Sequence, residues 1–289
     1  MASHSDDRYY VPHESHWPIV GSAGLLFLMV GVSVWLNGST PGFWVMMAGV
    51  AVIIYMVVGW FANVINESVT GMYNAQVDKS FRMGMMWFIF SEVMFFLAFF
   101  GALFYVRTMV LPWLGGESNN FFTNAVLWSG FESTWPSNGP AGMGGEFLVM
   151  GPVGLPLINT VILLASSVTV TIAHHALIAG NRGVLSGFLA ATFILGFIFI
   201  GLQAYEYVHA YNDLNLRLTT GIYGSTFFML TGFHGLHVTL GAIMLLVIWF
   251  RVLRGHFTKE NHFAFEAVAW YWHFVDVVWV GLYIFVYWL

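Results

Sequence analysis

Long apolar runs separated by short polar segments dominate this chain of 289 residues. An α-helix needs about 20 mainly apolar residues to cross the hydrocarbon core of a bilayer. Seven runs are long enough, and they cover residues 17–36, 43–64, 83–111, 155–178, 186–210, 222–250 and 265–289. The pattern therefore predicts an all-α membrane protein with seven transmembrane helices.

The polar segments between the runs predict how the chain is divided. Residues 1–16 form an N-terminal segment, and residues 17–289 form a single seven-helix membrane domain. A short turn at residues 37–40 leaves open that the first two helices are a separate hairpin. The longest interruption, about residues 112–154, is rich in Gly and Pro, with three Trp residues that suit a loop on the outer membrane interface. A role of this loop in docking a partner stays open.

Basic residues predict the orientation of the helices. One side of the membrane would hold Arg8, Lys79, Arg82, Arg182, Arg251, Arg254 and Lys259, and the other only Arg107 and Arg217. Because cytoplasmic segments carry the excess of Lys and Arg, the N-terminus is predicted to be inside and the C-terminus outside.

Composition excludes several classes of protein. Hydrophobic residues make up 58% of the chain and charged residues 8%, whereas soluble domains carry about 25% charged residues. A water-soluble globular domain and a disordered chain are therefore excluded. The net charge of −5 makes a nucleic-acid partner untenable. Cysteine is absent, so disulfides, thiolate metal sites and thiol catalysis are impossible.

Ionisable side chains inside the apolar runs are the candidate functional groups, since a charge in a bilayer needs a partner or a role. Glu92 lies in the third run, about three helical turns from Arg82, the nearest basic residue in the sequence. Two interpretations remain open for Glu92. One is a carboxyl that handles protons or contacts a ligand, and the other is a protonated acid hydrogen-bonded between helices.

Two pairs at helical spacing resemble fragments of metal sites. Glu206 and His209 have the Glu-x-x-His spacing of half a di-iron site, but no second copy exists, so an interfacial hydrogen-bonded pair is favoured. His234 and His237 share a helix face and could ligate a metal or haem. Glycines beside them favour close helix packing with hydrogen bonds instead.

The last run carries Glu266, His273 and Asp276 along one helical stripe. This stripe predicts either a proton relay or a structural network between helices. His174 and His175 are adjacent, so they point about 100° apart and cannot share a face. A separate basic cluster suits anionic lipid headgroups, and it consists of Arg251, Arg254, His256 and Lys259.

Several long aromatic and polar strings together resemble cytochrome c oxidase subunit III. The strongest are AFEAVAWYWHFVDVVWVGL at 264–282, YGSTFFMLTGFHGLH at 223–237 and LINTVILLASSVTVTIAHHA at 157–176. The resemblance implies two arms, helices 1–2 and helices 3–7, around a V-shaped cleft that holds phospholipids. It implies a non-redox core subunit of a proton-pumping oxidase, which supports proton uptake and protects the active site from inactivation during turnover.

The resemblance also implies partners, cofactors and sites. Haem and copper would lie in partner subunits I and II, with cytochrome c as the donor at the level of the complex, and this chain would hold no redox centre, catalytic residue or metal ligand. Glu92 matches the buried carboxyl of the family. The implied lipid contacts are Trp60, Glu67, His234, Arg251 and Arg254. Residues 70–74 depart from animal sequences. The long loop departs from mitochondrial members and indicates a bacterial inner (plasma) membrane, with the C-terminus in the periplasm.

Two other classes of function are weighed against this one. A proton-coupled transporter is motivated by the acidic residues within the runs, although the internal repeats and broken helices of transporters are not evident. A self-contained haem or di-iron oxidoreductase is motivated by the 11 His. Most of these His lie at helix ends or in loops, which disfavours this class.

Overall fold

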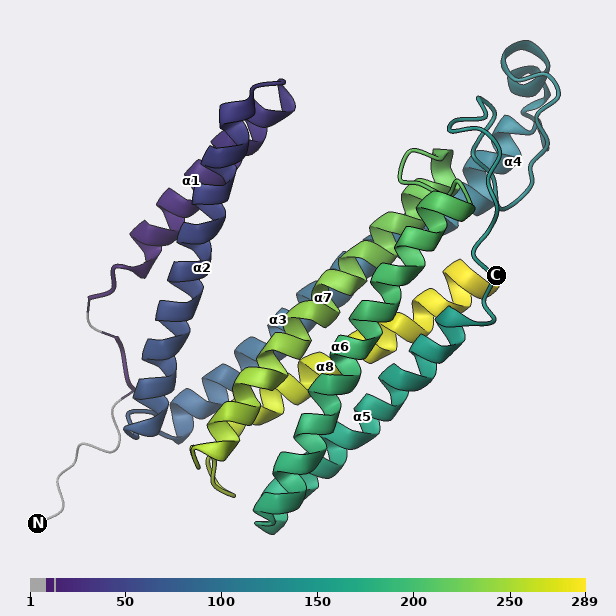
Figure 1. The fold of residues 1–289 in the computed structure, drawn as a ribbon. Helices are drawn as coiled ribbons and strands as arrows, with labels where there is room; N and C mark the ends of the chain where they lie inside the picture. Colours follow the sequence, from purple (N-terminus) through teal and green to yellow (C-terminus); the bar gives the residue numbers. More distant parts are fainter. Residues whose placement is uncertain (1–8, 13) are drawn as a thin grey trace, which may run out of the picture. The chain divides into compact units, whose positions relative to one another are not determined.

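The computed structural model describes residues 9–12 and 14–289, so much of the predicted N-terminal segment lies outside the described residues. Within the described part, seven helical segments are long and apolar enough to span a membrane, and they are Trp17–Leu36, Thr40–Val69, Ala75–Leu114, Leu155–Ala179, Arg182–Asp213, Gly221–Leu253 and Phe263–Trp288. The predicted all-α fold with seven membrane helices is confirmed (Figure 1).

The described residues form eight α-helices and three π-helical segments. The α-helices are α1 (Trp17–Leu36), α2 (Thr40–Val69), α3 (Ala75–Tyr105), α4 (Leu111–Leu114), α5 (Leu155–Ala179), α6 (Arg182–Asp213), α7 (Gly221–Leu253) and α8 (Phe263–Leu282). Three wider π-helical turns are η1 (Val106–Val110), η2 (Thr123–Leu127) and η3 (Tyr283–Trp288). The third span thus continues from α3 through η1 into α4.

Helix α3 begins at Ala75, earlier than the predicted residue 83. The Asn74 side chain explains this start, because its Oδ1 accepts a hydrogen bond from the Val77 amide at 3.0 Å. Such a bond satisfies one of the unpaired amides of a first helical turn. Hydropathy detects only the part of a helix that lies in hydrocarbon, so polar end turns escape it.

The chain divides into two compact units, Met1–Met83 and Gly84–Leu289. In the first unit α1 and α2 form an antiparallel hairpin, whose two backbones touch at glycines. A methyl group on Gly31 would collide with the backbone of Met46, and one on Gly49 with the backbone of Leu28. Small residues commonly permit this close approach between membrane helices.

In the second unit, α8 lies among its neighbours with two fully buried tryptophans. Trp279 Nε1 donates to Thr160 Oγ1 at 2.9 Å, and Trp272 Nε1 donates to Ser166 Oγ at 2.9 Å. Both hydroxyls belong to α5, so the two hydrogen bonds set the register of the α5–α8 contact. Aromatic side chains with a polar N–H need such a partner when they are buried.

The loop at residues 112–154 is anchored to the connection between α6 and α7. Asn215 Nδ2 donates to the carbonyls of Gly144 and Glu146, at 3.0 and 2.9 Å. The Leu148 amide donates to the carbonyl of Leu214 at 2.9 Å. The expected irregular loop therefore has fixed attachments, and it contains the short helical turn η2 after the end of α4.

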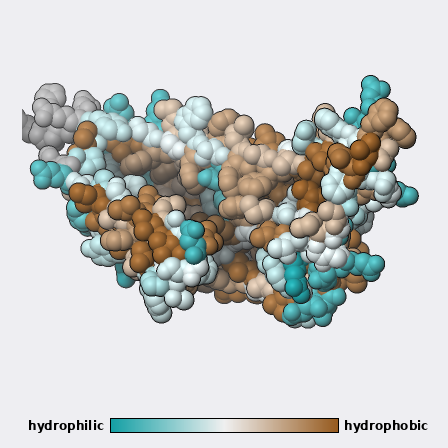
Figure 2. All heavy atoms as spheres, turned by 90° about the horizontal axis from the view of Figure 1, so that it is seen from above, coloured by the Kyte–Doolittle hydropathy of each residue, from teal (hydrophilic) through white to brown (hydrophobic). Residues whose placement is uncertain are grey.

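Large apolar side chains remain exposed along the helices of both units. Examples are Leu25, Trp44, Met86, Phe104, Val161 and Val277. Figure 2 shows hydrophobic side chains over much of the face in view. Such a surface suits hydrocarbon, where helices satisfy their backbone hydrogen bonds internally.

Candidate functional site

Glu92 on α3 pairs with His237 on α7. Glu92 Oε2 lies 2.9 Å from His237 Nε2. His237 Nδ1 lies 2.6 Å from the Phe233 carbonyl, which can only accept a hydrogen bond. Nδ1 of His237 therefore carries a hydrogen. A hydrogen bond between Nε2 and Oε2 then requires one further proton. This proton sits either on the carboxyl or on the imidazole, so the pair is neutral overall in both arrangements.

Aromatic rings surround this pair. The Phe96 ring centroid lies 5.0 Å from that of His237, and the Tyr271 hydroxyl donates to the His237 carbonyl at 3.3 Å. The side chain of Glu92 keeps 22% of its surface exposed and that of His237 keeps 12%. The structure thus contains the interhelical hydrogen bond that one interpretation of Glu92 expected, and sequence reasoning missed His237 as its partner.

Glu206 and His209 do not form the expected pair with each other, and each has a different partner. Glu206 is fully buried, and its Oε1 accepts a hydrogen bond from Tyr287 at 2.6 Å. His209 Nδ1 lies 2.6 Å from Asp213 Oδ2, one helical turn further on α6. The rotation of α6 explains this difference, because it turns Glu206 toward η3 and leaves His209 at the surface.

His234 lies in the core of the second unit with no exposed surface. Its Nε2 donates to the Val275 carbonyl on α8 at 3.1 Å, and its ring packs against Trp279. This geometry matches the expected packing role. It argues against the lipid contact that the resemblance implied, because the imidazole does not reach the surface of the chain.

The stripe on α8 faces α5. His273 Nδ1 lies 2.8 Å from Ser167 Oγ and 3.7 Å from Asp276 Oδ2. Glu266 approaches His174 of α5 at 3.7 Å. The structure therefore places all three stripe residues along one contact between two helices, as expected for a structural network. A proton relay along the same groups stays a hypothesis.

Arginines gather where α7 ends and α6 begins. Arg251 is largely buried, and its guanidinium lies 4.5 Å above the Phe257 ring. Arg182 donates to the Phe257 carbonyl at 2.6 Å, and Arg254 is exposed at the end of α7. Burial, followed by the charges of Arg251 and Arg254, lowers the pKa of His256 below its ordinary value. The local field is therefore positive.

The two implied lipid contacts in the first unit have different surroundings. Trp60 is exposed on α2. Glu67 accepts a hydrogen bond from the Tyr73 hydroxyl at 2.6 Å. Burial, together with this bond and the charge of Glu67, raises the pKa of Tyr73. The Glu67 carboxylate thus already accepts a hydrogen bond from within the first unit.

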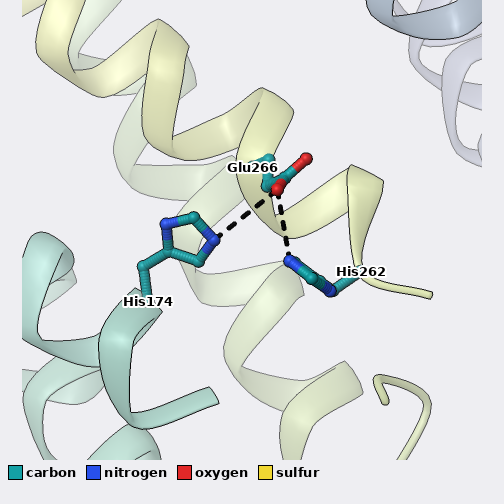
Figure 3. Close-up of side chains that lie close together, drawn as sticks. All are labelled: His174, His262 and Glu266. Atoms are coloured by element: carbon teal, nitrogen blue, oxygen red, sulfur yellow. Dashed lines mark ion pairs between the residues drawn. The ribbon is translucent and has the colours of Figure 1, made fainter. Parts of the chain in front are cut away.

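A further cluster joins the C-terminal part of α5 to the start of α8. His174, His262 and Glu266 direct their polar atoms at one another (Figure 3). Sequence reasoning missed this cluster because His174 lies far from the other two along the chain. The i, i+4 spacing of His262 and Glu266 is the one local signal for it.

Fold and sites define a multi-pass helical membrane protein with polar pairs between its helices. The sequence model of the family "Cytochrome c oxidase subunit III" matches residues 7–289. Cytochrome c oxidase subunit 3 of Squalus acanthias is 39% identical over 287 residues, which cover 99% of this chain and 98% of that protein. The proteins of that name from Formosania lacustris and Gadus morhua are 40% and 39% identical with the same coverage. The chain belongs to the cytochrome c oxidase subunit III family.

This membership confirms the resemblance seen in the aromatic strings. The relatives are subunits of cytochrome c oxidase, an oxidoreductase complex, so the family implies assembly with other oxidase subunits. Haem and copper in those other subunits are consistent with the family.

Proposed function

We propose that this chain is the non-redox core subunit of a proton-pumping terminal cytochrome c oxidase. Electrons from cytochrome c would reach oxygen through haem and copper in subunits I and II. The single observation that carries this assignment is the family match across residues 7–289. The basic-residue asymmetry and the long loop support a bacterial inner membrane with a cytoplasmic N-terminus.

The pair of Glu92 and His237 supports a role in proton uptake. Glu92 Oε2 and His237 Nε2 lie 2.9 Å apart, so one proton can bridge the two groups. The proton can move between the carboxyl and the imidazole without changing the net charge of the pair. Since a net charge in the membrane is costly, a neutral pair of this kind can hold a proton there at low cost. Sustained proton uptake would in turn protect the active site of the complex during turnover.

Bound phospholipids form the second part of the proposal. Arg254 is exposed, and the Nε of Arg251 has no hydrogen-bond partner among the described residues. Two guanidinium groups at one end of α7 suit a lipid phosphate. The exposed indole of Trp60 and the carboxylate of Glu67 are kept as further contacts. His234 is omitted, because its side chain is buried.

Catalytic lifetime tests the proton-uptake role. In the purified oxidase complex, Glu92→Gln should leave the initial rate of oxygen reduction near that of the wild type and reduce the number of turnovers before inactivation. Deletion of the whole chain should have a larger effect in the same direction. Glu117→Gln, at an exposed loop position, is the matched control. An unchanged lifetime in the deletion strain would overturn the protective role.

Native mass spectrometry tests the lipid role. Arg251→Ala and Arg254→Ala should each reduce the number of anionic lipids retained by the chain. Arg217→Ala is the control, since Arg217 is exposed in the connection between α6 and α7. Arg254 is exposed, so its variant is expected to fold even where Arg251→Ala does not. Equal lipid counts in all variants would remove the assignment.

A further inference from the structure

Three nitrogen and oxygen atoms converge between α5 and α8. His174 Nε2 lies 3.7 Å from Glu266 Oε1, and His262 Nε2 lies 3.2 Å from the same oxygen. All three ligand atoms lie within 4.8 Å of one another. In a tetrahedral zinc site with bonds of about 2.1 Å, the ligand atoms are separated by roughly 3.4 Å. Small side-chain shifts would therefore bring these atoms into coordination geometry.

The tautomer of His262 supports a cation at the centre of this cluster. Its Nδ1 lies 3.2 Å from the Thr258 carbonyl, which accepts a hydrogen bond, so Nδ1 carries a hydrogen. In the neutral imidazole, the lone pair of Nε2 would then point at an oxygen of Glu266, which also carries lone pairs. Only a proton or a metal ion between them makes this contact favourable. A backbone carbonyl that orients the second nitrogen is usual for metal-binding His.

His174 supplies the second observation. Its Nε2 is shielded from solvent and has no hydrogen-bond partner among the described residues. The three side chains are largely withdrawn from solvent, with 26% of His174, 10% of His262 and 15% of Glu266 exposed. A desolvated imidazole nitrogen without a hydrogen-bond partner is costly, and a metal ion would satisfy it.

We propose that His174, His262 and Glu266 bind one divalent transition-metal ion, of which Zn²⁺ is the representative. Two imidazoles and one carboxylate suit zinc and related ions, whereas Ca²⁺ and Mg²⁺ prefer oxygen ligands. Three protein ligands leave a fourth position for water. The ion would tie the C-terminal part of α5 to the first turn of α8. This site is independent of the proposed oxidase function.

Zinc binding to the purified full-length chain tests the proposal. After treatment with a chelator and addition of ZnSO₄, elemental analysis should find one retained zinc per chain. X-ray absorption at the zinc edge should show imidazole and carboxylate ligands. His174→Ala and Glu266→Gln should each weaken binding at least tenfold. His175→Ala is the matched control, because His175 is adjacent in sequence but outside the cluster, and it should bind like the wild type.

Thermal unfolding separates binding from folding. A ligand that binds only the folded chain raises its unfolding temperature, so zinc should stabilise the wild type and the His175→Ala variant but not the two site variants. If His174→Ala does not fold, Glu266→Gln decides, since it preserves the size of the side chain. Zinc retention that is the same in Glu266→Gln and the wild type would overturn the proposal.

Discussion

At the residue scale, the pair of Glu92 and His237 is the main candidate for proton chemistry. The placement of hydrogens in this pair depends on one contact: His237 Nδ1 donates a hydrogen bond to the Phe233 carbonyl at 2.6 Å. Once that hydrogen is placed, the contact of 2.9 Å between Nε2 and Oε2 requires a shared proton. Burial among aromatic rings keeps competing water away from most of the pair.

Infrared spectroscopy checks the shared proton. If the proton resides on the carboxyl, the wild type should show a protonated C=O stretch that is absent in Glu92→Gln. If it resides on the imidazole, an imidazolium signal should disappear in His237→Asn. Glu117→Gln should change neither signal. A wild-type spectrum with neither signal would contradict the shared proton.

His256 predicts a pH dependence of stability. Its pKa in the folded chain is lowered by burial and by Arg251 and Arg254, whereas the unfolded chain has the ordinary value of about 6.5. Below that pH the unfolded chain binds more protons, so stability present above about pH 6.5 is lost as the pH falls. His256→Asn should lose less thermal stability on acidification than the wild type. An equal loss in both proteins would refute this contribution.

Hydrogen bonds between α5 and α8 are the main feature at the element scale. Side chains on α8 form hydrogen bonds with hydroxyls on α5 at several positions, from Trp279 with Thr160 to His273 with Ser167. In hydrocarbon, apolar burial distinguishes poorly between alternative helix pairings. The hydrogen bonds therefore specify the register of the two helices.

A double-mutant cycle measures one of these bonds. Ser166→Ala and Trp272→Phe should each destabilise the chain, and their coupling energy should be about 0.6 kcal/mol, the average for such bonds in membrane helices. Unfolding in detergent mixtures gives the four free energies. The same cycle with exposed Trp288→Phe in place of Trp272→Phe should give no coupling. Additive effects of Ser166 and Trp272 would show that the bond does not stabilise the fold.

The glycine contact between α1 and α2 is also tested at this scale. Gly31→Ala should destabilise the chain by about 1–3 kcal/mol, because the new methyl group would collide with the backbone of Met46. Gly101→Ala is the matched control, since no atom beyond its chain neighbours and its own helix backbone lies within 4 Å of the new methyl group. A thermal shift equal to that of the control would contradict close packing of the hairpin.

The sequence predicted the elements better than their contacts. Hydropathy defines seven membrane helices because the bilayer sets their length, but it does not reach polar end turns such as the one that Asn74 begins. The i, i+7, i+10 stripe on α8 was recognisable. Its partner Ser167 was not, because pairing depends on how two distant helices rotate. The cluster of His174 with Glu266 was missed for the same reason.

At the scale of the whole molecule, the chain is proposed to be a cofactor-free subunit that works within an oxidase. The family match covers residues 7–289 and implies an oxidase complex, and the Glu92 pair supports the proposed role in proton uptake. The transporter alternative has the same buried acids but receives no support from the family.

A reduced-minus-oxidised visible spectrum of the affinity-tagged chain is the decisive test of the proposed role as a cofactor-free oxidase subunit. One sample would be extracted gently from native membranes, and the other would be stripped of its partners. We expect haem bands in the first sample and none in the second. Haem bands in both would show that this chain binds haem itself. Bands in neither would show that it is not held in an oxidase, and either result would contradict the proposed role.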